Sequence, residues 1–364
     1  MLRVDRRLLS NVDWPLLGAA FTIILLGILS LSSVGLGRGA SGLAWRQLMW
    51  VGVGVVALLG VVTFDYRSLV RAAPALYLFG LGLLATVFML GRTVSGARRW
   101  IHLGPLTFQP SELFKVIFIL TLAWALTWRR EPQQTTRGTL VGIFILVGIP
   151  FALVVRQPDL GTALVLLPVL GAVLLGVGVR LRILGALVAV GVALMPLGWL
   201  VLKPYQRDRF LVYLDPFRDP LGTAYNVIQA KIAIGSGQLL GKGISGATQS
   251  RLAFLPERHT DFVFAVFAEM WGFVGCLVLI VAYAVLVLRG FEIAVGTREA
   301  RGRIIALGVT ALFAAQTLIN LGMVTGLLPV VGIPLPLMSY GGSSMVVSFM
   351  ALGLLLSVRM RQFQ

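Results

Sequence analysis

Long apolar runs, separated by short polar stretches, are the dominant pattern along this chain. A helix that spans a bilayer needs about 20 mostly apolar residues. Strands of a membrane barrel alternate apolar and polar residues and would not produce such runs. The pattern therefore predicts an all-α polytopic membrane protein with about ten transmembrane helices. The ten windows cover residues 14–35, 46–64, 70–91, 111–128, 137–155, 160–179, 181–202, 262–288, 303–328 and 340–358.

Composition narrows the class of protein further. Of the 364 residues, 58% are hydrophobic and only 12% are charged, and the mean hydropathy is +0.92. A soluble domain has roughly 25% charged residues, so soluble enzymes, fibrous proteins and disordered proteins are excluded. The net charge of +17 is typical of cationic membrane loops that contact anionic lipid headgroups, rather than of nucleic-acid binding. The single cysteine, Cys276, excludes an internal disulfide and a cysteine-based metal cluster.

The distribution of Lys and Arg predicts that both termini are cytoplasmic, because positive residues concentrate in cytoplasmic loops. With that orientation, the termini and the even-numbered loops hold sixteen Lys or Arg residues, and the short odd-numbered loops with their adjoining helix starts hold seven. The large loop between the seventh and eighth spans is then extracytoplasmic. The first apolar run is too long for a cleaved signal peptide, so it predicts an uncleaved anchor in the cytoplasmic membrane.

Two segments stand out within what we interpret as a single membrane domain over 1–364. The outer loop 203–261 is too long for an idle connection. It contains an apolar-patterned stretch, 226–243, that predicts an amphipathic helix at the membrane surface followed by a glycine-rich turn. Those glycines either let the chain fold back or expose N–H groups to a phosphate. Segment 329–339 is apolar, but its three prolines forbid a regular helix, so we interpret it as a re-entrant or interfacial loop.

The unusual polar, Gly/Pro-rich segments all fall on the predicted outer face, which indicates a functional site there. The outer loop carries more bases than acids. These bases either contact lipid headgroups or bind an anionic ligand such as a pyrophosphate. They are Lys203, Arg207, Arg209, Arg218, Lys231, Lys242, Arg251 and Arg258.

Acidic residues at the starts of three spans are candidates for chemistry. Asp261 begins the eighth span, where it is either a helix N-cap or a general base at the membrane interface. Glu112 and Lys115 are three residues apart and can pair on one helix face. Capping explains Asp159 and Glu112, since each follows a Gln-Pro pair. Glu269 lies inside a span, where a charge is expensive and is either paired or functional.

Other motifs are missing or uninformative. His102 and His259 lie in outer loops without the carboxylate spacing of a metal site. No Walker loop, GxSxG, HExxH or dinucleotide fingerprint occurs. No nucleotide cofactor is therefore expected. An enzyme on the outer face has no ATP, so its substrate must carry its own leaving group.

The polar segments resemble the SEDS family (shape, elongation, division, sporulation) over nearly the whole chain. The segments that carry the resemblance are RRWIHLGPLTFQPSELFK, QPDLGTAL, DPFRDPLGTAYNVIQAKIAIGSGQLLGKG, FLPERHTDFVFAVFAE and NLGMVTGLLPVVGIPLPLMSYGGSSM. FLPERHTDF and IQAKIAIGSG are more similar to the rod-shape branch than to the division branch. Met270 and Trp271 depart from residues that the family often has, away from the expected chemistry.

The resemblance implies a peptidoglycan glycosyltransferase that polymerises lipid II into β-1,4 glycan strands for cell elongation and shape. The family's essential aspartate in the HTDF motif corresponds to Asp261, and its QPSExxK pair and QPDLGT acid correspond to Glu112, Lys115 and Asp159. The expected mechanism is inverting, with Asp261 as general base. Further substrate-binding candidates are Arg99, Arg207, Arg209, Lys231, Lys242, Arg258 and His259.

The expected cofactor and partners follow from the same resemblance. A divalent cation such as Mg²⁺ or Mn²⁺ could neutralise the undecaprenyl pyrophosphate leaving group. A class B penicillin-binding protein, a transpeptidase, is the expected protein partner. The main alternative function is a lipid II flippase, favoured by Glu269 and the broken segment 329–339. A scaffold that only recruits a partner would leave the outer site without a purpose.

Overall fold

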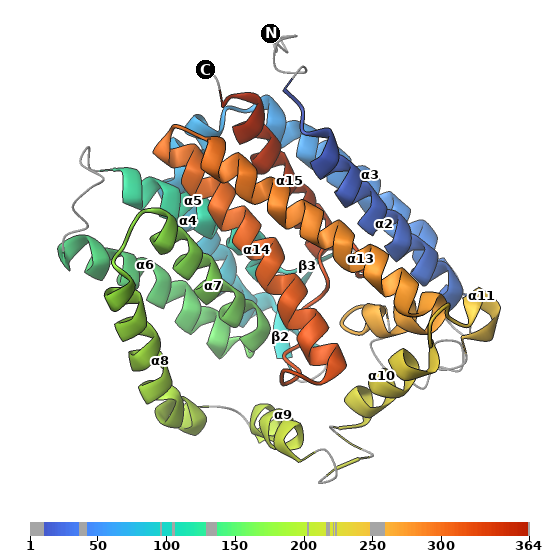
Figure 1. Cartoon of the computed structure of the whole chain (residues 1–364). Coiled ribbons are helices and arrows are strands. Elements are labelled where there is room, and N and C mark those ends of the chain that lie inside the picture. The colour runs from blue at the N-terminus through green and yellow to red at the C-terminus, as the bar shows by residue number, and fades with distance from the viewer. Residues whose placement is uncertain are drawn as a thin grey trace.

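Helices occupy all ten predicted windows in the computed structural model. It describes residues 11–35, 42–94, 97–103, 106–128, 137–201, 204–215, 219–220, 222, 224–247 and 259–362. The helices are α2 (Trp14–Gly35), α3 (Leu43–Thr63), α4 (Tyr66–Leu90), α5 (Pro110–Thr127), α6 (Arg137–Arg156), α7 (Leu160–Gly176), α8 (Leu181–Val201), α13 (Val263–Gly296), α14 (Ala300–Thr325) and α15 (Gly342–Met360). Figure 1 shows them gathered in one bundle, except α8, which lies at its edge. The prediction of an all-α polytopic membrane protein is confirmed.

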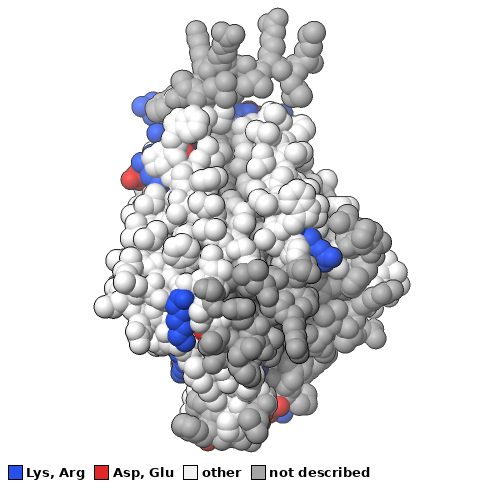
Figure 2. Space-filling model, turned by 90° about the vertical axis from the view of Figure 1, so that its right-hand side faces the viewer, with Lys and Arg blue, Asp and Glu red and all other residues white. Residues whose placement is uncertain are grey.

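Length and hydropathy single out seven of the described helices as able to cross a membrane. In α6, α7 and α8 the apolar stretches are shorter, at Val141–Arg156, Leu160–Gly176 and Leu181–Ala193. The helices α5, α14 and α15 are mostly buried inside the protein, whereas α3, α4 and α13 expose most of their surface. The first three therefore form the centre of the bundle. On the face seen in Figure 2, Lys and Arg are few and isolated between the two ends.

Helix α13 is longer than its predicted window, which ended at residue 288. It continues to Gly296, past Arg289, whose guanidinium pairs with Glu292 one turn later. Hydropathy predicts where the apolar surface of a helix ends. The helix itself can continue beyond that point, because ion pairs between side chains three residues apart stabilise it. The helix is also broken at Gly272, which has φ 63° and ψ −161°.

A small sheet, which the sequence analysis did not predict, follows α4. Strands β1 (Arg92–Val94), β2 (Ala97–Leu103) and β3 (Leu106–Phe108) are antiparallel in the order β1-β2-β3. Ile101 of β2 lies opposite Phe108 of β3. The strands are too short to give a clear alternation of apolar and polar residues. The sheet contacts α4, α5 and α15, and it leads the chain directly into the start of α5.

The described part of the outer loop folds into α9 (Pro204–Leu214), α10 (Tyr225–Ser236) and the short α11 (Gly243–Gly246). A helix within 226–243 is therefore present, and it packs on α13 and α14. That it lies on a membrane surface stays a prediction, as do the limits of the loop and the re-entrant nature of 329–339.

The glycine turn after α10 supplies hydrogen-bond partners for the backbone groups at the break in α13. At Gly272 the helical hydrogen bonds are interrupted, and the backbone groups there bond to the turn instead. The N–H of Phe273 donates to the carbonyl of Gln238 (2.8 Å), and that of Lys242 donates to the carbonyl of Glu269 (2.9 Å). A side chain at Gly241, which has φ 80°, would collide with the α13 backbone. These glycines therefore let the chain fold back, and the phosphate interpretation is not supported.

An ion-pair cluster joins three helices at the end of the bundle that holds both termini (Figure 1). Asp13, just before α2, is buried. Its carboxylate lies 2.7 Å from Arg289 of α13 and 3.7 Å from Arg359 of α15. Its Oδ1 also accepts the N–H of Leu16 (3.0 Å). Burial raises the pKa of this carboxyl, but the bonds and charges of its partners outweigh burial, so the pKa lies below its ordinary value of 3.8.

Replacing Asp13 by Asn tests this cluster. The change leaves Arg289 and Arg359 without their shared carboxylate. We expect a loss of about 2 kcal/mol in the free energy of unfolding, less than for a fully buried pair because the arginines keep contact with water. The measurement is thermal unfolding of both proteins in detergent between pH 3 and pH 8. Because the folded-state pKa is depressed, the difference should be full above pH 3.8 and shrink as the pH falls below it. A difference that does not change with pH contradicts the assignment.

Candidate active site

A cavity of about 240 Å³ lies at the other end of the bundle from the two termini. Its walls come from β2, α5, α7, α9 and α14, the turn before α13, and the segment before α15. Five of the predicted site residues line it: Arg99, Glu112, Lys115, Arg209 and Asp261. Residues that are far apart in the sequence thus meet in one enclosed space.

Asp261 lies in a turn whose backbone is tied down on both sides. Helix α13 begins at Val263, and Phe262 occupies the N-cap position without a side-chain cap. The interpretation of Asp261 as the N-cap is therefore wrong. The buried amide of Asn320, in α14, donates to the carbonyl of Asp261 (2.9 Å) and to that of Ile333 (2.7 Å). One side chain thus fixes the turn against the proline-rich segment.

The proline-rich segment between α14 and α15 forms the cavity wall directly beside Asp261. The hydroxyl of Ser339 donates to the carbonyl of Thr260 (2.7 Å), and the N–H of Tyr340 donates to that of His259 (2.8 Å). Gly332 has φ 72°. A Cβ at this position would lie 3.1 Å from Oδ2 of Asp261 and 3.8 Å from Nη1 of Arg209. A glycine here both permits the turn and leaves open the space between the carboxylate and the guanidinium.

Glu112 and Lys115 form a buried ion pair on the first turns of α5, as predicted. Nζ of Lys115 lies 2.8 Å from both carboxylate oxygens of Glu112. The two residues are only 3% and 2% exposed. Burying two charges is costly unless each is paired and hydrogen-bonded. Their position in the cavity wall makes them a source of fixed electrostatic field at the site.

Asp159 caps α7 and also anchors the cavity wall. It accepts the N–H of Thr162 (3.4 Å), which confirms the capping interpretation. Its carboxylate also accepts the amide of Gln109 (2.9 Å) and the hydroxyl of Ser111 (2.8 Å). Arg99, which lines the cavity, lies 3.6 Å from Oδ1. Asp159 therefore acts on the cavity through Arg99 and α5.

Other predicted substrate-binding residues lie elsewhere. The guanidinium of Arg207 lies 6.0 Å above the ring of Trp199. Lys231 is exposed beside Gly326. Lys242 pairs at 3.8 Å with Glu269, which is fully buried, so that intramembrane charge is paired. None of these lines the cavity.

His259 contributes to the cavity through its neighbour. Its ring packs edge-on against Tyr340, 5.8 Å between centroids, and Tyr340 lines the space. The side chains of His102, Lys203, Arg218, Arg251 and Arg258 lie outside the described residues.

The sequence analysis missed the neutral polar residues of the site. Gln316 lines the cavity and Asn320 holds its turn, both from within the apolar run of α14. Polar amides inside a span are themselves a signal of a buried hydrogen-bonded site. Gln109, Thr162, Thr260 and Ser344 also belong to the polar lining. Within the described ranges, no three His, Cys, Asp or Glu side chains come together as a metal site would require.

Comparisons with known proteins match almost the whole chain. Residues 12–364 match the family described as cell cycle protein, which groups FtsW, RodA and SpoVE. The peptidoglycan glycosyltransferase MrdB of Escherichia coli K12 is 40% identical over 341 residues, covering 92% of this chain and 91% of the relative.

Two solved structures share the fold. A chain from a peptidoglycan synthase complex, described as coordinating polymerization and crosslinking, is 36% identical with a TM-score of 0.82, covering 97% of this chain and 99% of that one. The crystal structure of the rod shape determining protein RodA of Thermus thermophilus is 31% identical with a TM-score of 0.74, covering 97% and 98%. The resemblance inferred from the motifs is thereby confirmed: this chain belongs to the FtsW/RodA/SpoVE family of cell cycle proteins, the SEDS family.

Proposed function

We propose that this chain is a peptidoglycan glycosyltransferase that polymerises lipid II into β-1,4 glycan strands for cell elongation and shape. The observation that carries the proposal is the cavity in which Asp261 meets Glu112, Lys115, Arg99 and Arg209. A relative with 40% identity is named a peptidoglycan glycosyltransferase. The matching structure of a rod shape determining protein favours the elongation branch.

Asp261 is the general base in this proposal. Its carboxylate takes the proton from the 4-hydroxyl of the acceptor N-acetylglucosamine, and the oxygen then bonds to C1 of the donor N-acetylmuramic acid. The bond from C1 to the pyrophosphate breaks, and undecaprenyl pyrophosphate leaves with the electron pair. An α-linked donor gives a β bond through a single inversion, so one base suffices. A Cβ at position 332 would lie 3.1 Å from Oδ2 of Asp261, so the glycine keeps this oxygen from being crowded.

Charge stabilisation comes from the cavity wall. Arg99 and Arg209 both line the space with guanidinium groups, which are suited to the oxygens of a pyrophosphate. Lys115 adds a positive charge, which Glu112 holds in place. Arg207, Lys231 and Lys242 lie outside this wall, so we leave them out of the mechanism.

A divalent cation, Mg²⁺ or Mn²⁺, is a separate part of the proposal. The described residues do not offer three clustered metal ligands. Asp261 is the residue of the cavity wall that would hold such an ion. The cation would supply neutralisation of the leaving group. The steps above rely on the chain's own residues.

The orientation and the partner belong to the same proposal. The protein is a multi-pass membrane protein, and we place both termini in the cytoplasm and the Asp261 cavity at the outer face of the cytoplasmic membrane. A class B penicillin-binding protein is the proposed partner, since a similar chain occurs in a synthase complex that couples polymerization to crosslinking.

A flippase for lipid II is the alternative, and the geometry favours it less. Transporters place ionisable groups near the bilayer midplane. Here the charged lining gathers at one end of the bundle, and Glu269 is committed to Lys242.

Replacing Asp261 by Asn tests the general base. The amide cannot accept the proton, so polymerisation of purified lipid II should fall by about 10²–10⁴-fold. The measurement is glycan formation in detergent, where no flipping is needed, with and without a cognate transpeptidase. The matched control is Asp208→Asn, the same change at an exposed residue of α9, which should polymerise at the wild-type rate. If D261N also keeps the wild-type rate, the mechanism is wrong; if the wild-type protein forms no glycan, the flippase alternative gains.

The buried pair is tested by single and double changes. E112Q strands the ammonium of Lys115, and K115M strands the carboxylate of Glu112, so each should lower the free energy of unfolding by about 3–5 kcal/mol. In E112Q/K115M no charge is stranded, and thermal unfolding should recover towards the wild type. Polymerisation should stay low in all three proteins because the field in the cavity is lost. A double variant with full activity would show that the pair is only structural.

A further inference from the structure

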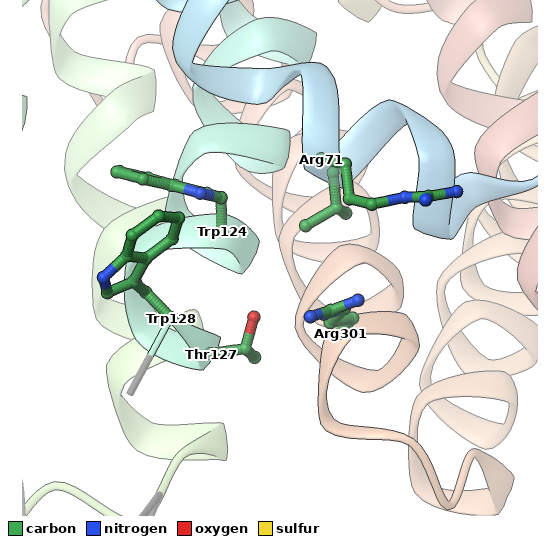
Figure 3. A pocket seen from close by; sticks show the side chains of 6 residues that line it. Arg71, Trp124, Thr127, Trp128 and Arg301 are labelled. Atoms are coloured by element: carbon green, nitrogen blue, oxygen red, sulfur yellow. The ribbon is translucent and has the colours of Figure 1, made fainter. Parts of the chain in front are cut away.

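A second cavity, of about 300 Å³, lies at the end of the bundle that holds the termini. It is formed between the starts of α4 and α14 and the end of α5. Figure 3 shows Trp124, Thr127 and Trp128 of α5 on one side, and Arg71 of α4 with Arg301 of α14 on the other. Its volume is within the range of small-ligand sites, about 300–1,000 Å³. The site of the proposed chemistry is at the opposite end, so this cavity is separate from it.

The described residues leave the positive charges in this cavity unbalanced. None of the described residues that line it is acidic. Within the described part of the chain, Arg301 forms no hydrogen bond or ion pair, and Arg71 donates only to the neutral hydroxyl of Ser68 (2.9 Å). Two guanidinium groups therefore line one space, and no carboxylate among the described residues pairs with either of them. Such a pair is suited to phosphate oxygens.

The neighbouring carboxylate is committed elsewhere. Glu299 lies two residues before Arg301, but its Oε2 accepts the hydroxyl of Tyr66 (2.8 Å) and Nε of Arg67 (2.6 Å). This bonding holds Glu299 on the α4 side. Arg301 is thereby left to an external anion, although an acid is close in sequence.

The aromatic wall identifies the kind of anion. Trp124 and Trp128 pack at 4.9 Å between ring centroids, and Trp128 is 69% exposed at the point where α5 ends. Tryptophan is enriched where a membrane span meets the headgroup region. A soluble phosphate has no apolar part that could pack against two indoles, whereas a lipid can pack its glycerol and upper acyl chain against them. Basic pockets between transmembrane helices bind anionic lipid headgroups.

We propose that the cavity between α4, α5 and α14 binds the phosphate of an anionic phospholipid. Arg71 and Arg301 hold the phosphate, and the two indoles pack on the lipid beyond it. The occupant belongs to the leaflet on the side of the chain termini. This site is independent of the proposed glycosyltransfer, so either assignment can fail without the other.

Native mass spectrometry of the full chain with phosphatidylglycerol tests the site. We expect one tightly bound phosphatidylglycerol, poor binding of phosphatidylcholine, and a loss of about tenfold or more in affinity for R71Q/R301Q. The matched control is R180Q/R182Q, which removes two exposed arginines at the start of α8, outside the cavity. It should retain the lipid. Equal retention by both double variants overturns the proposal.

Two further measurements separate a loss of lipid binding from a loss of fold and from binding of a soluble anion. R301Q alone removes a side chain without a partner in the described structure, so folding is preserved, and an intermediate loss of lipid is expected; no loss counts against the site. Addition of inorganic phosphate should leave the bound lipid in place. If phosphate alone displaces it, the cavity takes soluble anions and the lipid assignment is wrong. Retained polymerisation by R71Q/R301Q would show that the loss of lipid is not a loss of fold.

Discussion

The double hydrogen bond of Asn320 is the contact on which the active-site geometry depends. Part of the cavity wall is irregular backbone, whose N–H and C=O groups are not bonded within a helix. Where water is excluded, each such group that is left without a partner costs free energy. The buried amide of Asn320 accounts for two carbonyls at once, at Asp261 and Ile333. The hydroxyl of Ser339 likewise bonds to two backbone groups: it donates to the carbonyl of Thr260 and accepts the N–H of Leu335.

The same requirement explains the outer loop and α13. The break at Gly272 would leave backbone groups exposed within a long apolar helix. The turn after α10 approaches closely enough to bond to them, and only glycine at 237 and 241 permits that approach. Lys242 then reaches Glu269. The loop that carries many of the positive charges is thus attached to the helix that begins next to Asp261.

A structural feature could be predicted from the sequence where it depends on residues close together in the chain. Apolar runs located all ten helices, since burial in lipid is a property of each run by itself. The Glu112–Lys115 pair and the Asp159 cap were also predictable, because their partners are three residues away. The roles of Asn320, Gln316 and Gly332 were not, because they depend on contacts between segments far apart in the sequence. Likewise, nothing local separates Arg209, which lines the cavity, from Arg207, which packs on Trp199.

The three carboxylates around the cavity differ in what surrounds them, and this difference supports their separate roles. Both carboxylate oxygens of Glu112 accept hydrogen bonds from the ammonium of Lys115. The buried carboxylate of Asp159 accepts hydrogen bonds from the amide of Gln109, the hydroxyl of Ser111 and a backbone N–H. Either acid would have to give up these partners before it could accept a proton from a substrate. Asp261 is half-buried, and its Oδ2 faces the bare Cα of Gly332. A side chain larger than hydrogen at 332 would fill that approach. The proposed base therefore depends on a glycine at position 332, because any side chain there would crowd Oδ2 of Asp261.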